Sequence, residues 1–300
     1  MDALRVIGVD VGGTKTLAAV VDREGEIEQQ VVHPSDVSSQ DALLAGLDAI
    51  VEELHEGREI AAIGFGIPSR VDQRSGRAVA SVNIPLADVD FRDRMRERHN
   101  LPVGIDNDAN AATIGEWRAG AAKEARQVVM LTLGTGVGGG VILDGKPFRG
   151  ATGVGAELGH IVIGIDGPPC GCGGHGHLES YASGRAADAA ARGLYGERSD
   201  GHELVEKAKD GDAQAVEAVA EIGRHLGAGI ASLVNIFEPE VVVVGGGFGS
   251  SSGELLLGPA REVVAVEGLE PLRDTVRIVP AQLGFQAGVI GAAMVGFEAL

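Results

Sequence analysis

The sequence predicts an α/β protein of two domains, because short apolar runs alternate with helical patterns and the same opening pattern occurs twice. The first opening joins an apolar run at 4–11 to one at 17–21 through Gly12-Gly13-Thr14. The second joins runs at 127–133 and 137–143 through Gly134-Thr135-Gly136. Two strands linked by a Gly-Thr turn therefore begin each half, and we expect the halves to face a cleft.

Hydrophobic spacing predicts the other elements. Apolar positions such as Leu43, Leu47 and Leu54 recur at helical intervals, so a helix is expected over Gln40–Leu54. Further strands are expected at 27–32, 60–67, 103–105, 241–244 and 276–279. Further helices are expected at 91–99, 108–118, 213–237 and 287–300. We expect a smaller domain over 1–118 and 286–300, and a larger one over 119–285.

Composition excludes several classes of protein. A chain of 300 residues with 44% hydrophobic content can build two cores, and its net charge of −18 disfavours nucleic acid and anionic membranes as partners. Two cysteines cannot form a disulfide framework, and no apolar run approaches the ~20 residues of a membrane helix. The first residues lack the order of a signal peptide, so a cytoplasmic protein is expected.

The glycine turns are candidate phosphate sites. In Asp10-Val11-Gly12-Gly13-Thr14-Lys15, backbone N–H groups, a hydroxyl and an ammonium can face an anion, and Asp10 can hold Mg²⁺ through water. Thr135 and Gly136 lie at the equivalent place in the second half. An ordinary hairpin turn is the alternative for either one. Gly246 and Gly247, after a strand, either approach a nucleotide or merely start a helix.

A polar cluster opens the helix expected at 108. Asp106-Asn107-Asp108-Ala109-Asn110 follows a strand, and helix capping explains one such residue but not four of five. The helix N-terminus favours the charged form of Asp108, which makes it a candidate general base. In a loose phosphoryl-transfer transition state the base need only take the proton late.

A metal loop follows in the second half. Cys170, Cys172, His177 and His160 supply the four ligands of a structural zinc site, with His175 as a competing ligand and a metal-free loop as the alternative. If His160 binds through one ring nitrogen, the other carries a proton and becomes an aimed donor. Together with Glu157 and Glu179 as acceptors, this donor suits a polyol such as a sugar.

These motifs resemble those of the ROK family of sugar kinases and repressors over nearly the whole chain. The resemblance implies an actin-like ATPase (ribonuclease H-like) fold. It also implies that ATP donates a phosphoryl group to the 6-hydroxyl of a hexose, with glucose as the first expected substrate, as in glycolysis. It implies Asp108 as base and homodimers or homotetramers. Implied sugar contacts are Ser69, Asn83, Asn107, Asp108, Glu157, His160 and Glu179, and implied phosphate contacts are Thr14, Lys15, Thr135 and Gly136.

The sequence departs from the family pattern at two positions. His177 stands where a third cysteine is usual, and Ser69 replaces the glycine of a G-x-P-G turn. Mannose, fructose and N-acetyl hexosamines remain alternative substrates. The alternative functions are a sugar-responsive repressor, for which no helix-turn-helix is expected before residue 4, and a zinc-stabilised binding protein without catalysis.

Overall fold

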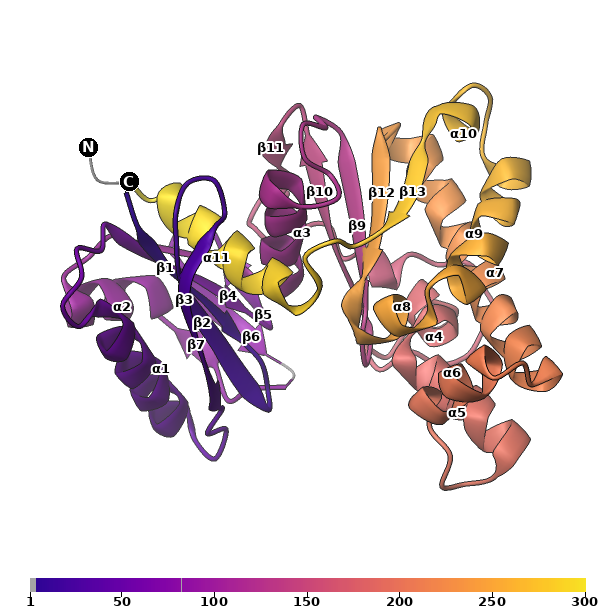
Figure 1. The fold of residues 1–300 in the computed structure, drawn as a ribbon, viewed down its shortest axis with the longest axis horizontal. Coiled ribbons are helices and arrows are strands. Elements are labelled where there is room, and N and C mark those ends of the chain that lie inside the picture. Colours follow the sequence, from indigo (N-terminus) through magenta and orange to yellow (C-terminus); the bar gives the residue numbers. More distant parts are fainter. Residues whose placement is uncertain (1–3, 82) are drawn as a thin grey trace. The chain divides into compact units, whose positions relative to one another are not determined.

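The computed structural model describes residues 4–81 and 83–300, which form two compact units (Figure 1). Unit 1 comprises 1–124, 147–156 and 285–300, and unit 2 comprises 125–146 and 157–284. Residues 119–124, 147–156 and 285, which were expected in the second domain, belong to unit 1.

Unit 1 is built on a five-stranded sheet in the order β3-β2-β1-β4-β8. β1 pairs antiparallel with β2 and parallel with β4, and β4 pairs parallel with β8. The strands are β1 (Val6–Val11), β2 (Lys15–Val21), β3 (Ile27–Pro34), β4 (Ala62–Ile67) and β8 (Val103–Asn107). A small antiparallel sheet that the sequence did not predict consists of β5 (Ser69–Asp72), β6 (Arg77–Ser81) and β7 (Ala87–Val89).

A row of glycines lets the last helix lie directly on this sheet. Gly8, Gly64 and Gly104 are register partners on neighbouring strands, and α11 (Ala287–Phe297) crosses them. A Cβ placed on Gly64 would lie 1.8 Å from the carbonyl oxygen of Ala292. The final helix therefore packs on the first unit, as expected, and also against α3 (Asp108–Ala119), as Figure 1 shows.

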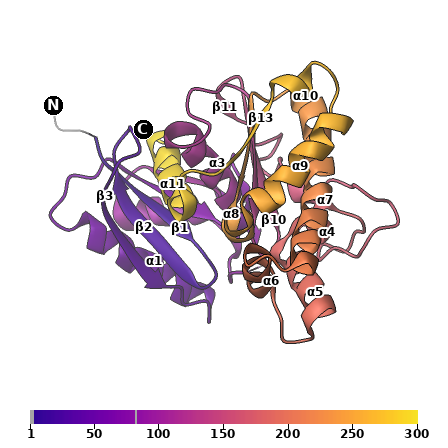
Figure 2. The same ribbon diagram turned by 45° about the vertical axis from the view of Figure 1, so that its right-hand side comes forward.

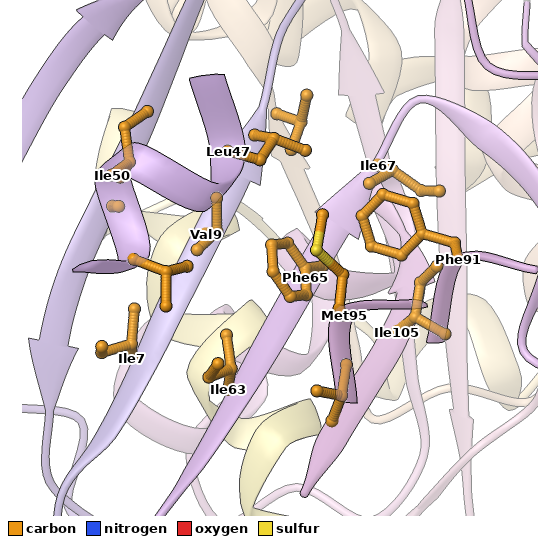
Figure 3. Packing of buried hydrophobic residues seen from close by; sticks show 14 of the residues in the cluster. Ile7, Val9, Leu47, Ile50, Ile63, Phe65, Ile67, Phe91, Met95 and Ile105 are labelled. Atoms are coloured by element: carbon orange, nitrogen blue, oxygen red, sulfur yellow. The ribbon is translucent and has the colours of Figure 1, made fainter. Parts of the chain in front are cut away.

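The other face of the sheet carries the main apolar core of unit 1. Side chains of α1 (Gln40–His55) and α2 (Phe91–His99) meet those of the central strands there. Figure 3 shows Phe65 and Met95 among the packed residues, and the rings of Phe65 and Phe91 meet edge to face with centroids 5.1 Å apart. This core holds the ends of β1, β4 and β8 in fixed register.

Unit 2 repeats the strand order with the sheet β11-β10-β9-β12-β13. Its strands are β9 (Val128–Leu133), β10 (Val137–Leu143), β11 (Lys146–Pro147), β12 (Val241–Gly245) and β13 (Arg277–Pro280). Its helices are η1 (Leu158–His160), α4 (Leu178–Ala182), α5 (Gly184–Tyr195), α6 (Gly201–Lys209), α7 (Ala213–Phe237), α8 (Gly246–Ser252), α9 (Glu254–Glu267) and α10 (Leu272–Thr275), with η2 (Gly284–Gln286) leading to α11.

Two glycines of the long helix α7 allow another helix to pack closely against it. It is continuous, and Gly223 and Gly227 let α9 approach, because Cβ atoms there would lie 2.4 and 2.5 Å from carbonyl oxygens of that helix. Figures 1 and 2 both show α7 and α9 side by side. In the part of the chain that the structure describes, no helix has the length and apolarity that crossing a membrane requires.

Candidate functional site

The first glycine turn connects β1 to β2 in unit 1. The N–H of Gly12 donates to the carbonyl of Lys15 at 3.0 Å, and Thr14 and Lys15 are exposed. A Cβ on Gly12 would lie 2.7 Å from that same carbonyl oxygen, so only glycine fits the closed turn. The turn leaves a hydroxyl and an ammonium accessible to an anion.

Asp10 lies on β1 directly before this turn. Burial and the nearby Asp108 carboxylate raise the pKa of Asp10 to about 7, while Lys15 opposes the shift. Gly288 of α11 provides the space, since a Cβ there would lie 2.4 Å from Asp10 Oδ2. The Asp10 carboxylate, with a second carboxylate close by, is the kind of oxygen ligand that suits the Mg²⁺ expected at Asp10.

Parallel pairing brings the polar cluster to the same sheet edge as Asp10. Asp10 is the register partner of Gly66 on β4, and Gly66 is the partner of Asp106 on β8. Asn107 follows and caps α3, its Oδ1 accepting from the N–H of Ala109 at 2.9 Å. Asp108 is the first residue of α3, where the helix dipole favours a carboxylate.

An ion pair that the sequence did not predict supports this helix start. Asp106 is fully buried, and its Oδ2 accepts from Arg149 Nε at 2.6 Å. Its Oδ1 accepts from the N–H of Asn107 and from Asn110 Nδ2 at 2.8 and 3.0 Å. Arg149 also pairs with Glu298 at 2.8 Å. The sequence offered no signal for Arg149, because it lies far along the chain in no motif.

Two further predicted sugar contacts belong to unit 1. Ser69 is buried, its Oγ donates to the Ala80 carbonyl at 3.0 Å, and its own carbonyl lies 3.4 Å from Asn107 Nδ2. Ser69 is not among the residues with positive φ, so serine replaces the family glycine without strain. Asn83 is exposed, and its carbonyl oxygen would lie 3.0 Å from a Cβ on Gly13.

A pocket of about 380 Å³ opens beside the first turn. Its polar wall comes from Asp10 and the turn itself, and its apolar wall comes from Leu17, Val32 and Phe285. Phe285 is 67% exposed and precedes α11. Sequence reasoning missed these apolar lining residues, since each reads as an ordinary strand or loop residue.

The second glycine turn connects β9 to β10 in unit 2. The Gly134 N–H donates to the Gly136 carbonyl at 2.9 Å, and Thr135 is exposed. Gly246, with φ +81, starts α8 beside the end of β9, where a Cβ would lie 2.5 Å from the backbone of Leu133. Gly247 has open space around it. The structure thus brings Gly246 next to this turn.

The four predicted metal ligands lie together in unit 2. The ligand atoms of His160, Cys170, Cys172 and His177 all lie within 4.8 Å of one another. His160 Nδ1 is 3.3 Å from His177 Nδ1, which is 3.3 Å from Cys172 Sγ, and Cys170 Sγ is 3.7 Å from His160 Nδ1. These three separations lie within the range of edge lengths of a zinc tetrahedron, about 3.3–3.8 Å for mixed N and S ligands.

The two candidate histidines differ in their position relative to the cluster. Among the described residues, His175 does not belong to this group, whereas His177 does. Because Nδ1 is the ring nitrogen of His160 that faces the cluster, its Nε2 would carry the proton when a metal is bound. Glu157 is exposed at the start of η1, and its carbonyl accepts from the N–H of His160 at 3.0 Å.

Glu179 lies between the cluster and the second glycine turn. Its Oε2 accepts from the Val137 N–H at 2.9 Å, and its Oε1 is 3.7 Å from Cys170 Sγ. The sequence predicted Glu179 only as a sugar contact, and its bond to the turn became visible only in the folded chain.

Two α/β units with the same strand order, each with a Gly-Thr turn between its first two strands, define the actin-like ATPase class. The sequence profile of the ROK family matches residues 6–297, and the chain belongs to that family.

Its relatives include kinases and repressors. A glucokinase of Streptomyces coelicolor is 37% identical, with 96% of each chain covered. The structure of a ROK family glucokinase from Streptomyces griseus in complex with glucose and AMPPNP is 37% identical, with a TM-score of 0.82 and coverage of 98% of this chain and 99% of that one. A xylose repressor of Caldicellulosiruptor bescii is 31% identical over 97% of this chain and 77% of its own length.

Proposed function

We propose that this protein is an ATP-dependent hexose kinase that phosphorylates the 6-hydroxyl of glucose. The observation that carries the proposal is Asp108 at the start of α3, at the sheet edge shared with Asp10 and the first glycine turn. The similarity to glucokinases over nearly their whole length supports the substrate.

Each proposed role follows from the position of the group. Asp108 orients the hexose hydroxyl and accepts its proton as the bond from the hydroxyl oxygen to the γ-phosphorus of ATP forms and the bond from that phosphorus to the ADP oxygen breaks. Asn107 presents its amide at the same helix start, with Ser69 beside it, and Asn83 lies beside Gly13 of the first glycine turn. Glu157, Glu179 and the Nε2–H of His160 are the further proposed partners for sugar hydroxyls. Phosphate contacts are Thr14, Lys15, Thr135 and Gly136, with Gly246 and Gly247 toward the nucleoside.

Two metal ions complete the proposal. Asp10 would hold Mg²⁺ through water, and that ion would offset the charge of the nucleotide phosphates. Zinc at His160, Cys170, Cys172 and His177 would fix the tautomer and direction of the His160 ring. Cys170 is buried and Cys172 is exposed, so the cluster is closed from one side only.

A panel of sugars tests the function. Purified protein is incubated with ATP, Mg²⁺ and glucose, mannose, fructose or an N-acetyl hexosamine, and ADP release is measured. We expect the highest kcat/KM with glucose. A preference for another hexose would contradict only the assignment of glucose as the substrate. Absence of turnover with every sugar in the panel would contradict the proposed kinase activity.

The repressor similarity motivates one competing function. A sugar-responsive repressor would bind operator DNA with an affinity that changes when sugar is added. With a net charge of −18, we expect no DNA binding at physiological salt. Retention of a promoter library by the protein, released by sugar, would favour the repressor.

The proposal extends to assembly and location. A cytoplasmic homodimer or homotetramer is expected, as the family resemblance implies. Light scattering across a range of protein concentrations measures the mass of the particle in solution. A monomer mass at every concentration would contradict this part of the proposal.

A further inference from the structure

The short helix α4 connects the metal cluster to the second glycine turn. His177, one of the four candidate ligands, is the N-cap residue of α4, and Glu179 lies in its first turn. One oxygen of the Glu179 carboxylate accepts from the Val137 N–H at 2.9 Å, and the other is 3.7 Å from Cys170 Sγ. A single side chain therefore contacts both a candidate ligand and the residue that directly follows the turn.

The far end of α4 is attached to the same turn. The Gly184 N–H, two residues beyond α4, donates to the Gly134 carbonyl at 2.7 Å. A Cβ on Gly136 would lie 2.1 Å from Glu179 Oε2, so the carboxylate fills the space beside the turn. The start and the end of the turn are thus each hydrogen-bonded to the segment that carries the metal ligand.

We infer that the metal cluster sets the affinity of the Gly134–Gly136 turn for nucleotide phosphate, and that Glu179 is the positioning residue that transmits the effect. The inference rests on the proposed function, which takes this turn as a phosphate site. A helix of five residues has little stability of its own, so its first turn depends on outside contacts. Bound metal holds Cys170 and His177 at a fixed separation, and this keeps Glu179 on the Val137 N–H.

Nucleotide binding in the absence of sugar tests the inference. Calorimetry measures the Kd of ADP for zinc-loaded and chelator-treated protein, in the wild type and in Glu179→Ala. We expect chelation to weaken ADP binding by about tenfold in the wild type, the scale of one charge-assisted hydrogen bond. Because metal removal and the substitution act through one contact, chelator treatment of Glu179→Ala should raise the Kd of ADP by less than about threefold. Glu206→Ala on α6 is the matched control and should respond to chelation as the wild type does.

The outcomes separate the two proposals. Equal weakening by chelation in both backgrounds, or no weakening in the wild type, would overturn the role of Glu179 but leave the kinase intact. Absence of ADP binding to the zinc-loaded wild type would instead contradict the proposed function.

Hydrogen exchange provides a second readout that does not depend on nucleotide. The Val137 amide should exchange slowly in zinc-loaded protein and faster after chelation or in Glu179→Ala. Amides of β12, in the same unit, should keep their protection. Loss of protection across β12 as well would mean that unit 2 unfolds as a whole. Unchanged exchange at Val137 would mean that the bound metal has no effect on the turn. Either result would overturn the inference.

Discussion

At the scale of single residues, the candidate site of unit 1 holds a carboxylate in surroundings that disfavour its charged form. Asp10 is half-buried beside Asp108, and the absence of a side chain at Gly288 leaves the space that the Asp10 oxygens occupy. Such an arrangement lowers the free energy of unfolding, and it also provides a negatively charged position that can bind a cation.

Replacement of Asp108 tests the proposed base. Asp108→Asn keeps the shape but removes the proton acceptor, so turnover should fall by ~10² or more while sugar binding changes little. Steady-state kinetics with glucose, beside calorimetric binding of glucose, measure both quantities. Turnover within a few-fold of the wild type would remove Asp108 from the base role.

Replacement of Asp10 tests the cost of its burial. The pKa of Asp10 is raised from 3.8 to about 7 in the folded chain. Between these values the unfolded chain loses the proton while the folded chain keeps it, so stability falls as pH rises through that window. Asp10→Asn should therefore match the wild type near pH 4 but exceed it by about 1–3 kcal/mol near pH 8, with turnover lost. Urea unfolding at both pH values measures this, and equal stability at the higher pH would show that Asp10 ionises without cost.

At the scale of elements, the position of α3 depends on a buried ion pair. Asp106 is fully buried directly before the helix, and Arg149, from the segment that returns to unit 1, is its counter-ion. The pair holds the strand end and the helix start together, which sets the direction of Asp108.

Removal of one partner tests this pair. Arg149→Met should lower the free energy of unfolding by about 3–5 kcal/mol, because it leaves the Asp106 charge buried without its counter-ion. The double variant with Asp106→Asn should recover part of that loss. Glu298→Gln, which breaks only the outer contact of Arg149, should cost less than about 1 kcal/mol. A loss for Arg149→Met no larger than for Glu298→Gln would contradict the assignment.

Substitution of glycine tests the contact between α11 and the sheet. Gly64→Ala places a methyl group 1.8 Å from the Ala292 carbonyl oxygen, so the helix must move and stability should fall by about 3 kcal/mol or more. Gly46→Ala in α1 is the control, because a methyl group there has no neighbouring atom within 4 Å. This variant should raise the free energy of unfolding by up to about 1 kcal/mol, since alanine favours the helix more than glycine does. Chemical denaturation of both variants decides, and similar stabilities would mean that the packing is loose.

At the scale of the whole molecule, two units of the same topology each present a glycine turn at the same connection. The proposed sugar substrate binds only the folded chain, so its binding should stabilise that chain.

Glucose at about 100 times its Kd should raise the free energy of unfolding by about 2.7 kcal/mol. Thermal unfolding with glucose, and with L-glucose as the mirror-image control, measures the shift. An equal response to both sugars would indicate a solvent effect and not a site.

Local patterns predicted much of this protein. The period of apolar residues predicted α1 and the end-to-end extent of α7, and the alternation of strands and helices predicted two α/β units. The small sheet of β5, β6 and β7 was missed because its short strands are only partly buried and lack a clean alternation. The ligand spacing left His175 as a competitor of His177, and the folded chain groups His177 with His160, Cys170 and Cys172.

Sequence alone determined which chemical groups this chain carries and on which elements they lie, because turns, caps and periodicity are local. Only the tertiary structure decided which groups meet. Arg149 reaches Asp106, Gly288 makes room for Asp10, and Glu179 holds the turn before Val137. Each of these contacts joins segments far apart in the chain, and such contacts depend on packing geometry that no local pattern specifies.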